Sequence, residues 1–247
     1  MNTDDFIIIV QARTGSSRLP NKIIKPFHNN KCILDIIVDK LKQNKFNIPV
    51  VVATTKNKND NVLVNHKYNV FRGDENNVLQ RFIDCAEHYE KKIVIRVCSD
   101  NPFISLKYFE KLVENYNNQD YYSYFIGDCP AIKTHCGLFC EIVKLSALQY
   151  IQELTNKQKY FEHVTNYLYT HPEKFCVQFA ETIYNHKLLR DIRLTIDTQN
   201  DFDLVKQVYE DYHKLHDSDT EDLTILLESL TKETLNKMHF AIIKNSK

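Results

Sequence analysis

The residues best suited to chemistry gather near the start of the chain, in residues 11–22, which read QARTGSSRLPNK. We call this stretch the cationic segment, because it holds three cations: Arg13, Arg18 and Lys22. Cationic side chains, together with backbone N–H groups near Gly15 and Ser16, are suited to surround the oxygens of a phosphate. A solvated basic loop that only joins a strand to a helix has the same composition, so the segment alone leaves both interpretations open.

Two carboxylates follow apolar runs farther along the chain. Asp100 comes shortly after the predicted strand 93–97, and Asp197 follows residues 194–196, which we also expect to be a strand. Because the carboxyl ends of parallel strands meet at one edge of a sheet, the two side chains can converge over one crevice. Mg²⁺ suits such a pair, since it keeps several waters and takes one or two carboxylates plus substrate phosphates.

Each carboxylate also has a local alternative. Asp100 lies two residues before Pro102, a context that is typical of an Asx-turn. For Asp197 the alternative is weaker, because Thr198 is the better N-cap of the next helix, with Asp201 as its partner three residues later. This assignment leaves Asp197 outside the helix and free to point at the site.

Alternating strand-like and helix-like segments in the first half of the chain would position these groups. Strands are expected at 6–10, 50–53, 68–71 and 93–97, and helices at 34–41, 62–66, 78–86 and 106–116. Such alternation implies right-handed βαβ units and a mainly parallel sheet, in an α/β fold. In the second half we expect strands and turns over 121–143, helices at 145–154, 161–169, 202–212 and 222–243, a strand at 175–179 and a polar loop at 213–220.

The composition is that of a globular chain without a strong charge bias. Lys and Arg number 32, and Asp and Glu also number 32. A balanced charge gives no overall attraction to nucleic acid or an anionic membrane, so an anion site must be a local cluster. The N-terminus is acidic and no apolar run approaches membrane-spanning length, so we expect a cytoplasmic protein with neither a nucleic acid nor a membrane as partner.

Seven cysteines with scattered spacing argue against a disulfide framework. One local cluster could bind zinc and consists of Cys129, His135, Cys136 and Cys140. Its spacing lacks the paired C-x-x-C knuckles of structural zinc sites, so buried free thiols are the favoured interpretation.

Six short motifs occur in an order typical of one known family: QARTGSSRLPNK (11–22), VVATT (51–55), FRGDENNVLQRF (71–82), VCSDNP (97–102), EHVT (162–165) and RLTIDTQNDFD (193–203). Together they resemble the cytidylyltransferases, most closely the spore-coat polysaccharide branch and more distantly the CMP-sialic acid and CMP-3-deoxy-manno-octulosonate synthetases. The resemblance covers residues 5–212. It implies a three-layer, Rossmann-like nucleotidyltransferase fold of the glycosyltransferase-A-like α/β type, with a mainly parallel sheet.

The resemblance also implies what each part of the site does. CTP would lie across the cationic segment, with its phosphates held by Arg13, Arg18 and Lys22. Mg²⁺ would be carried by Asp100 and Asp197. The cytosine and ribose would be surrounded by the backbone around Gln11 and Ala12, with Thr54, Arg72, Val78 and Arg81. The acceptor would face Glu141, Glu162 and His163. Glu141 could equally be a strand-edge charge, and a lone histidine such as His163 is more often structural or on the surface.

The chain departs from the family pattern where the acceptor is expected. Ser99 replaces the usual glycine before the metal aspartate, and Asn101 stands where cysteine or glutamate is common. Within 133–143, Cys136 and Phe139 replace two aspartates of a D-G-x-D-x-E stretch, and only Glu141 of that acidic set remains. The identity of the acceptor and the choice of CTP over other triphosphates therefore do not follow from the residues.

The expected activity is transfer of CMP from CTP to a sugar, sugar acid or phosphorylated acceptor, with release of pyrophosphate, in surface polysaccharide or glycoconjugate biosynthesis. Two alternatives are a glycosyltransferase that uses a nucleotide sugar and a non-catalytic nucleotide-binding protein of the same family. We expect a nucleotidyltransferase domain over 1–220, in which 120–190 bind the acceptor and dimerise, and a helical appendage over 221–247. The aromatic-rich residues 145–180 would pair two subunits of a homodimer.

Overall fold

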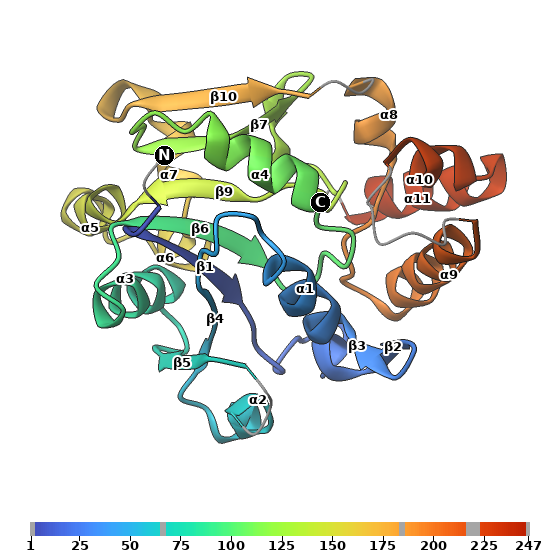
Figure 1. Ribbon diagram of the computed structural model, residues 1–247, viewed down its shortest axis with the longest axis horizontal. Helices are drawn as coiled ribbons and strands as arrows, with labels where there is room; N and C mark the ends of the chain where they lie inside the picture. Colours follow the sequence, from blue (N-terminus) through green and yellow to red (C-terminus); the bar gives the residue numbers. More distant parts are fainter. Residues whose placement is uncertain (1–2, 65–67, 183–185, 216–222, 246–247) are drawn as a thin grey trace.

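A mixed, mainly parallel sheet forms the centre of the molecule (Figure 1). The computed structural model describes residues 3–64, 68–182, 186–215 and 223–245. The strands run in the order β10-β7-β9-β6-β1-β4-β5, with β8 paired to β7. Their bounds are β1 (Phe6–Gln11), β4 (Val50–Thr55), β5 (Val70–Gly73), β6 (Ile93–Cys98), β7 (Tyr121–Ile126), β8 (Cys129–Pro130), β9 (Glu141–Lys144) and β10 (Val177–Glu181). Strand β9 is antiparallel to both of its neighbours, whereas β5, β4, β1 and β6 are parallel, so the predicted sheet type is confirmed.

Helices cover both faces of this sheet, which gives three layers. One face carries α1 (Ile33–Leu41), α4 (Leu106–Glu114) and α9 (Gln199–Leu215), and the other carries α3 (Val78–His88), α5 (Leu145–Leu154), α6 (Gln158–Glu162) and α7 (Asn166–Thr170). Because side chains alternate along a strand, Ile8 and Val10 of β1 enter the first core and Ile7 and Ile9 the second. This burial on both sides explains why β1 is a continuous apolar run.

The remaining elements are short or lie at the end of the chain. They are the hairpin β2 (Pro26–His28) and β3 (Lys31–Cys32), and the helices α2 (Asn61–Val64), α8 (His186–Asp191), α10 (Leu223–Ser229) and α11 (Lys232–Asn245). The two terminal helices join the main core through Leu226, Leu230 and Met238, all buried. Residues 213–215 of the predicted polar loop at 213–220 belong to α9, and residues 216–220 lie outside the described residues. Residues 65 and 66 of the predicted helix 62–66 also lie outside them.

The prediction of a strand at 194–196 is wrong. These residues are extended but pair with loops instead of a strand: Leu194 N–H donates to the His135 carbonyl at 2.9 Å and Ile196 N–H to the Asp100 carbonyl at 3.0 Å. Leu194 and Ile196 are fully buried beneath those loops. A short apolar run signals burial, and burial alone does not distinguish a strand from a covered loop.

The predicted helix 161–169 is also interrupted. Helix α6 ends at Glu162 and α7 begins at Asn166, with Thr165 as its N-cap residue. The Thr165 hydroxyl donates to the Glu141 carboxylate at 2.9 Å, and Val164 is fully buried. These long-range contacts account for the break, which the helical spacing of the apolar residues did not reveal.

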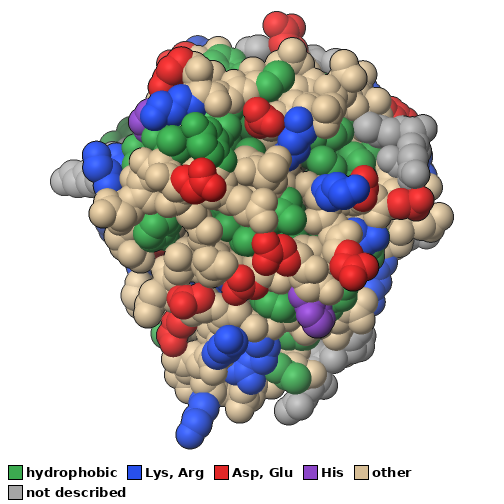
Figure 2. All heavy atoms as spheres, turned by 90° about the vertical axis from the view of Figure 1, so that its left-hand side faces the viewer, with side chains coloured by type: hydrophobic (Ala, Val, Ile, Leu, Met, Phe, Trp, Pro, Cys, Tyr) green, Lys and Arg blue, Asp and Glu red, His purple; other side chains and the backbone are tan. Residues whose placement is uncertain are grey.

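The outer surface agrees with the balanced composition. On the face that Figure 2 shows, acidic and basic side chains of the described residues are interspersed. In the part of the chain that the structure describes, no helix is both long and apolar enough to span a bilayer.

Candidate active site

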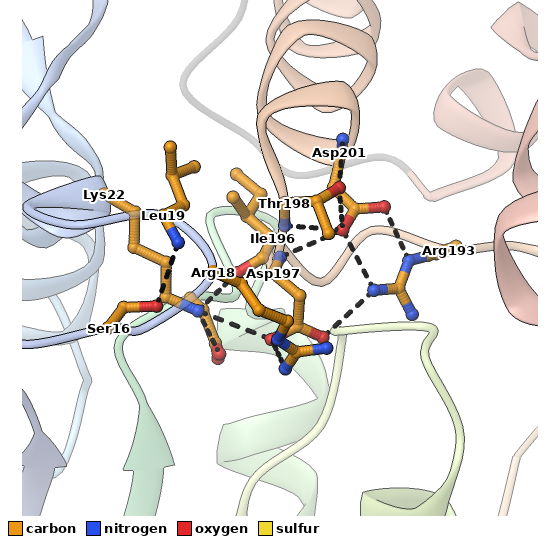
Figure 3. A network of polar contacts seen from close by, with 10 residues as sticks. Ser16, Arg18, Leu19, Lys22, Arg193, Ile196, Asp197, Thr198 and Asp201 are labelled. Atoms are coloured by element: carbon orange, nitrogen blue, oxygen red, sulfur yellow. Dashed lines mark hydrogen bonds and ion pairs between the residues drawn. The ribbon is translucent and has the colours of Figure 1, made fainter. Parts of the chain in front are cut away.

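Lys22 brings the two predicted metal-binding carboxylates together (Figure 3). Its Nζ lies 3.0 Å from Asp100 Oδ2 and 3.6 Å from Asp197 Oδ1, and it donates to the Ile196 carbonyl at 2.5 Å. Only 11% of the Lys22 side chain is exposed. Asp100 reaches this point from the end of β6, and Asp197 from the extended residues 194–196. The structure therefore brings the two predicted carboxylates to one cation, although Asp197 comes from a loop and not from the end of a strand.

Asp197 is surrounded by positive charge (Figure 3). Arg18 donates to its Oδ1 at 2.8 Å from a side chain that is 54% exposed. Arg193, whose side chain is only 1% exposed, donates to Oδ2 at 3.0 Å. Together with Lys22, these contacts place cations beside both carboxylate oxygens. Sequence reasoning missed Arg193, because the i,i+4 pairing rule holds for helices and residues 194–196 are extended.

Asp201 holds Arg193 in place and lies in the first turn of helix α9. Arg193 donates to both Asp201 oxygens, at 2.7 and 3.0 Å. The predicted capping box is confirmed, because Thr198 N–H donates to Asp201 Oδ2 at 2.8 Å and Asp201 N–H to the Thr198 hydroxyl at 3.2 Å. Burial raises the pKa of Asp201, but the bonds from Arg193 and Thr198 outweigh it and hold the pKa below the ordinary value.

These oxygens suit a divalent metal ion in type. Two carboxylates and the Ile196 carbonyl are hard donors, the kind that Mg²⁺ prefers. At present they converge on the Lys22 ammonium, and Arg18 also contacts Asp197. The donor set therefore fits Mg²⁺ in the type of its oxygens. Across the described chain, no cluster of three or more His, Cys, Asp or Glu side chains suits a metal ion.

A buried aspartate that sequence reasoning missed anchors the cationic segment. Asp60 Oδ1 accepts from the Thr14 N–H at 2.7 Å and from the Thr14 hydroxyl at 2.6 Å. Asp60 Oδ2 accepts from the Thr55 hydroxyl at 2.5 Å. Burial raises the pKa of Asp60, but these bonds outweigh it and lower the pKa below its ordinary value. The carboxylate thus ties the segment to the end of β4, beside a pocket of about 50 Å³ that Arg13 and Gly15 also line.

Gly15 does not adopt a left-handed backbone conformation. A Cβ atom added there would meet no atom within 4 Å, and its φ is not positive. The left-handed residue of the segment is Asn21, with φ of 59°. The N–H of Ser16 is bonded to the Thr14 carbonyl at 2.9 Å. The Arg13 side chain of this turn is exposed.

Arg81 is the most unusual member of the predicted cytosine and ribose set. It is 1% exposed, and among the described residues its Nε and Nη1 have no hydrogen-bond partner. Burial, followed by the repulsion of Arg13, lowers its pKa to about 10. Gly73 makes room for it, since a Cβ atom at Gly73 would lie 2.7 Å from Arg81 Cγ. Two buried donors without partners fit a site that a ligand completes.

The other members of that set have different surroundings. Arg72 donates within the chain, to the Thr55 carbonyl at 2.9 Å, the Asn57 carbonyl at 2.8 Å and Asn61 Oδ1 at 2.7 Å. Three others are buried at the ends of β1 and β4 and at the start of α3: Ala12, Thr54 and Val78. Gln11 is half-buried at the end of β1. Arg72 in this arrangement shapes the loop after β4.

Glu141 lies inside the molecule. It is 1% exposed and accepts from Arg96 at 2.5 Å, from the Tyr121 hydroxyl at 2.5 Å and from Thr165 at 2.9 Å. Arg96 in turn donates to Gln11 Oε1 at 3.1 Å. The other two predicted acceptor residues, Glu162 and His163, are exposed at the end of α6.

The two positions that depart from the family pattern in this region are also interior. Cys136 is 1% exposed, and Phe139 packs edge-on against Tyr108 with ring centroids 4.9 Å apart. Cys140 is buried as well, so the prediction of buried thiols is confirmed for Cys136 and Cys140, whereas Cys129 is half-buried.

Comparisons with known proteins agree on one family. A family model described as cytidylyltransferase matches residues 7–232. The spore coat polysaccharide biosynthesis protein SpsF of Bacillus subtilis (strain 168) is 32% identical over 237 residues, which cover 91% of this chain and 94% of that protein.

Solved structures show the same similarity. A cytidylyltransferase from Leptospira borgpetersenii serovar Hardjo-bovis (strain JB197) superposes with a TM-score of 0.80 at 28% identity, over 95% of this chain and 97% of that one. CMP:2-keto-3-deoxy-manno-octonic acid synthetase, solved in complex with CTP, superposes with a TM-score of 0.62 at 14% identity, over 83% of this chain and 98% of that one. At this identity the second likeness shows the fold alone.

Proposed function

This chain belongs to the cytidylyltransferase family of nucleotidyltransferases, and from that premise we propose that it transfers CMP from CTP to a sugar, sugar acid or phosphorylated acceptor. The observation that carries the proposal is the convergence of Asp100 and Asp197 on Lys22, beside a segment rich in cations. The name of the Bacillus relative supports a place in surface polysaccharide or glycoconjugate biosynthesis. The synthetase solved with CTP supports that nucleotide as donor.

In the proposed reaction, an acceptor oxygen attacks the α-phosphorus of CTP in line. The new O–P bond forms as the bond from the α-phosphorus to the bridging oxygen breaks, pyrophosphate leaves, and a hydroxyl acceptor loses its proton to solvent. Positioning and charge stabilisation supply most of the rate in such transfers. Arg13, Arg18 and Lys22 would hold the phosphates and stabilise the charge that develops on pyrophosphate. Mg²⁺ bound by Asp100 and Asp197 would supply further neutralisation of the α-phosphate.

The cation contacts suggest how nucleotide binding begins. In this structure Lys22 and Arg18 neutralise the carboxylates that would hold the metal ion. We propose that both cations move to the triphosphate when CTP arrives, because phosphate oxygens offer them a stronger charged partner. Arg193 stays in place, since Asp201 holds it on the buried side. Lys22 and Arg18 would thus have an anionic partner both in the free site, where it is a carboxylate, and in the nucleotide-bound site, where it is the triphosphate.

The acceptor side of the proposal rests on Glu162 and His163, which are exposed beside the buried Glu141 network.

Homodimerisation through residues 145–180 is also part of the proposal. Most aromatic side chains of that segment pack inside the chain, as Tyr160 and Tyr167 do. Tyr150 is 43% exposed and offers the apolar surface for a partner subunit. Gel filtration at micromolar concentration gives a dimer if this is right.

Pyrophosphate release measured with each nucleoside triphosphate, over a panel of sugar, sugar-acid and phosphorylated acceptors, tests the proposed reaction. We expect turnover with CTP and Mg²⁺, and a loss of at least about a hundredfold in Asp100→Ala and in Asp197→Ala. Asp211→Ala is the matched control, because that carboxylate pairs with Gln207 and Lys214 of the same helix α9.

Three results would count against the proposal. Near-normal pyrophosphate release by either aspartate variant would overturn the metal assignment. Release of a nucleoside diphosphate from a nucleotide sugar would identify a glycosyltransferase instead. Binding of CTP with Mg²⁺ by calorimetry, without turnover of any acceptor in the panel, would identify a non-catalytic member of the family.

A further inference from the structure

We propose that the side chain of Gln11 reads the cytosine ring through its Nε2 donors, and that the buried Arg96–Glu141 pair is positioning machinery that holds the amide in this orientation. The inference rests on the proposed use of CTP. In this inference Glu141 supports the Gln11 amide through Arg96. This role replaces the direct contact with an acceptor that the family resemblance implied.

The orientation of the Gln11 amide follows from the chemistry of its partner. Arg96 Nη2 lies 3.1 Å from the amide atom assigned as Oε1. A guanidinium only donates, so the atom that faces it must be the carbonyl oxygen, and a flipped amide would oppose two donors. Nε2 therefore points away from Arg96. No hydrogen bond from Nε2 is found among the described residues, and Gln11 is only half-buried.

Arg96 is in turn held by the Glu141 carboxylate, both oxygens of which accept hydrogen bonds. Glu141 Oε2 accepts from Arg96 Nη1, and Oε1 accepts from Tyr121 and Thr165. Burial and the Glu141 charge raise the pKa of Tyr121 well above its ordinary value, so this hydroxyl remains a donor. The side chains of Arg96 and Glu141 are 9% and 2% exposed. An ion pair this buried is costly to break, which makes it a rigid support for Gln11.

Gln11 lies next to the cationic segment, where the proposed nucleotide would bind. It is the last residue of β1, opposite Ala53 of β4 and Cys98 of β6. Its carbonyl accepts from Ser99 N–H at 3.3 Å, next to the metal-site Asp100. Two residues later the chain reaches Arg13, in the cationic segment. A ligand whose phosphates lie on that segment therefore passes the half-buried amide.

A fixed donor at this position distinguishes the two common pyrimidines. Cytosine presents lone pairs at O2 and N3, both of which accept from an amide NH₂. Uracil presents an N–H at N3, which would oppose the Gln11 donors. Because the Arg96–Glu141 pair prevents the amide from flipping, Gln11 cannot adapt to uracil by presenting its oxygen.

Isothermal titration calorimetry of CTP and UTP with the full chain tests the inference. Gln11→Glu is the informative variant, since it keeps the length and an oxygen for Arg96 but replaces the donors with an acceptor. We expect the dissociation constant for CTP to rise about tenfold and the preference for CTP over UTP to fall by a similar factor, with an unchanged melting temperature. A folded Gln11→Glu with wild-type affinity and preference would overturn the inference.

A double-mutant cycle separates positioning from simple stability. Glu141→Gln is expected to weaken CTP binding several-fold in the wild-type background and to have no further effect in Gln11→Met, where no amide remains to be held. Asp120→Asn is the matched control, because the Asp120–Lys144 pair, at 3.3 Å, lies at the other end of β9. Equal losses from Glu141→Gln in both backgrounds would refute the positioning role. A wild-type chain that binds no CTP at all would instead overturn the proposed function, and this inference with it.

Discussion

Replacing Lys22 with methionine should change metal binding and turnover in opposite directions. The ammonium lies 3.0 Å from Asp100 and 3.6 Å from Asp197. At an effective dielectric constant of about 20, these separations correspond to gross attractions of about 5.5 and about 4.6 kcal/mol. Desolvation offsets much of this, and the carboxylates are 28% and 20% exposed. We therefore expect Lys22→Met to lower the free energy of unfolding by about 2 kcal/mol.

The same charge calculation predicts tighter metal binding without nucleotide. Once the ammonium is gone, Asp100 and the Ile196 carbonyl lose their contact with Lys22, while Asp197 keeps its contacts with Arg18 and Arg193. A divalent cation then binds without displacing Lys22, so we expect the Mg²⁺ affinity to rise at least about tenfold, which corresponds to about 1.4 kcal/mol. Turnover should fall at least about a hundredfold, because the cation that would stabilise pyrophosphate is lost.

Calorimetry with Mg²⁺ alone, urea denaturation and pyrophosphate release measure the three effects separately. Lys25→Met is the matched control, since Lys25 lies three residues beyond the cationic segment and bonds to Gln199 at 2.9 Å. If Lys22→Met bound Mg²⁺ no more tightly than the wild type, the idea that this ammonium occupies the metal position would be refuted.

Two further predictions concern the anchors of the site. Asp60→Asn removes the carboxylate charge that accepts hydrogen bonds from Thr14 and Thr55. It should therefore raise the KM for CTP about tenfold or more, while kcat changes less. Steady-state kinetics with kcat and KM equal to those of the wild type would contradict this prediction. Asp201 has a pKa below its ordinary 3.8 in the folded chain, so its contribution to stability is present above about pH 4 and is lost as the pH falls through the folded-state pKa. Urea denaturation from pH 3 to 7 measures the difference in unfolding free energy between wild type and Asp201→Asn. This difference should be constant near neutral pH and become smaller in acid. A difference that does not depend on pH would exclude a lowered pKa of Asp201 in the folded chain.

Part of the site follows from local sequence because local contacts create it. The capping box between Thr198 and Asp201 spans three residues, so the spacing alone identifies it. The apolar run of β1 and the cations that follow it likewise place the cationic segment at the end of a buried strand. The alternation of strands and helices predicted the mainly parallel sheet, because each period reports which face an element buries.

Other features depend on chain segments that only the fold brings together. Asp60 bonds to Thr14 across 46 residues, and Lys22 to Asp100 across 78. No spacing rule reaches that far. The burial of Glu141 under Arg96 has the same origin, since β9 inserts antiparallel beside β6 and turns that carboxylate inward.

The sequence by itself determined the family, the sheet type, the cationic segment and the two carboxylates, because these are encoded by residue type and short-range periodicity. Only the tertiary structure decided which charges meet. It placed Lys22 between Asp100 and Asp197, tied the segment to Asp60, and made residues 194–196 a buried loop instead of a strand. The physical reason is that a hydrogen bond or ion pair acts over a few ångströms in space, and separation along the chain does not reveal that distance.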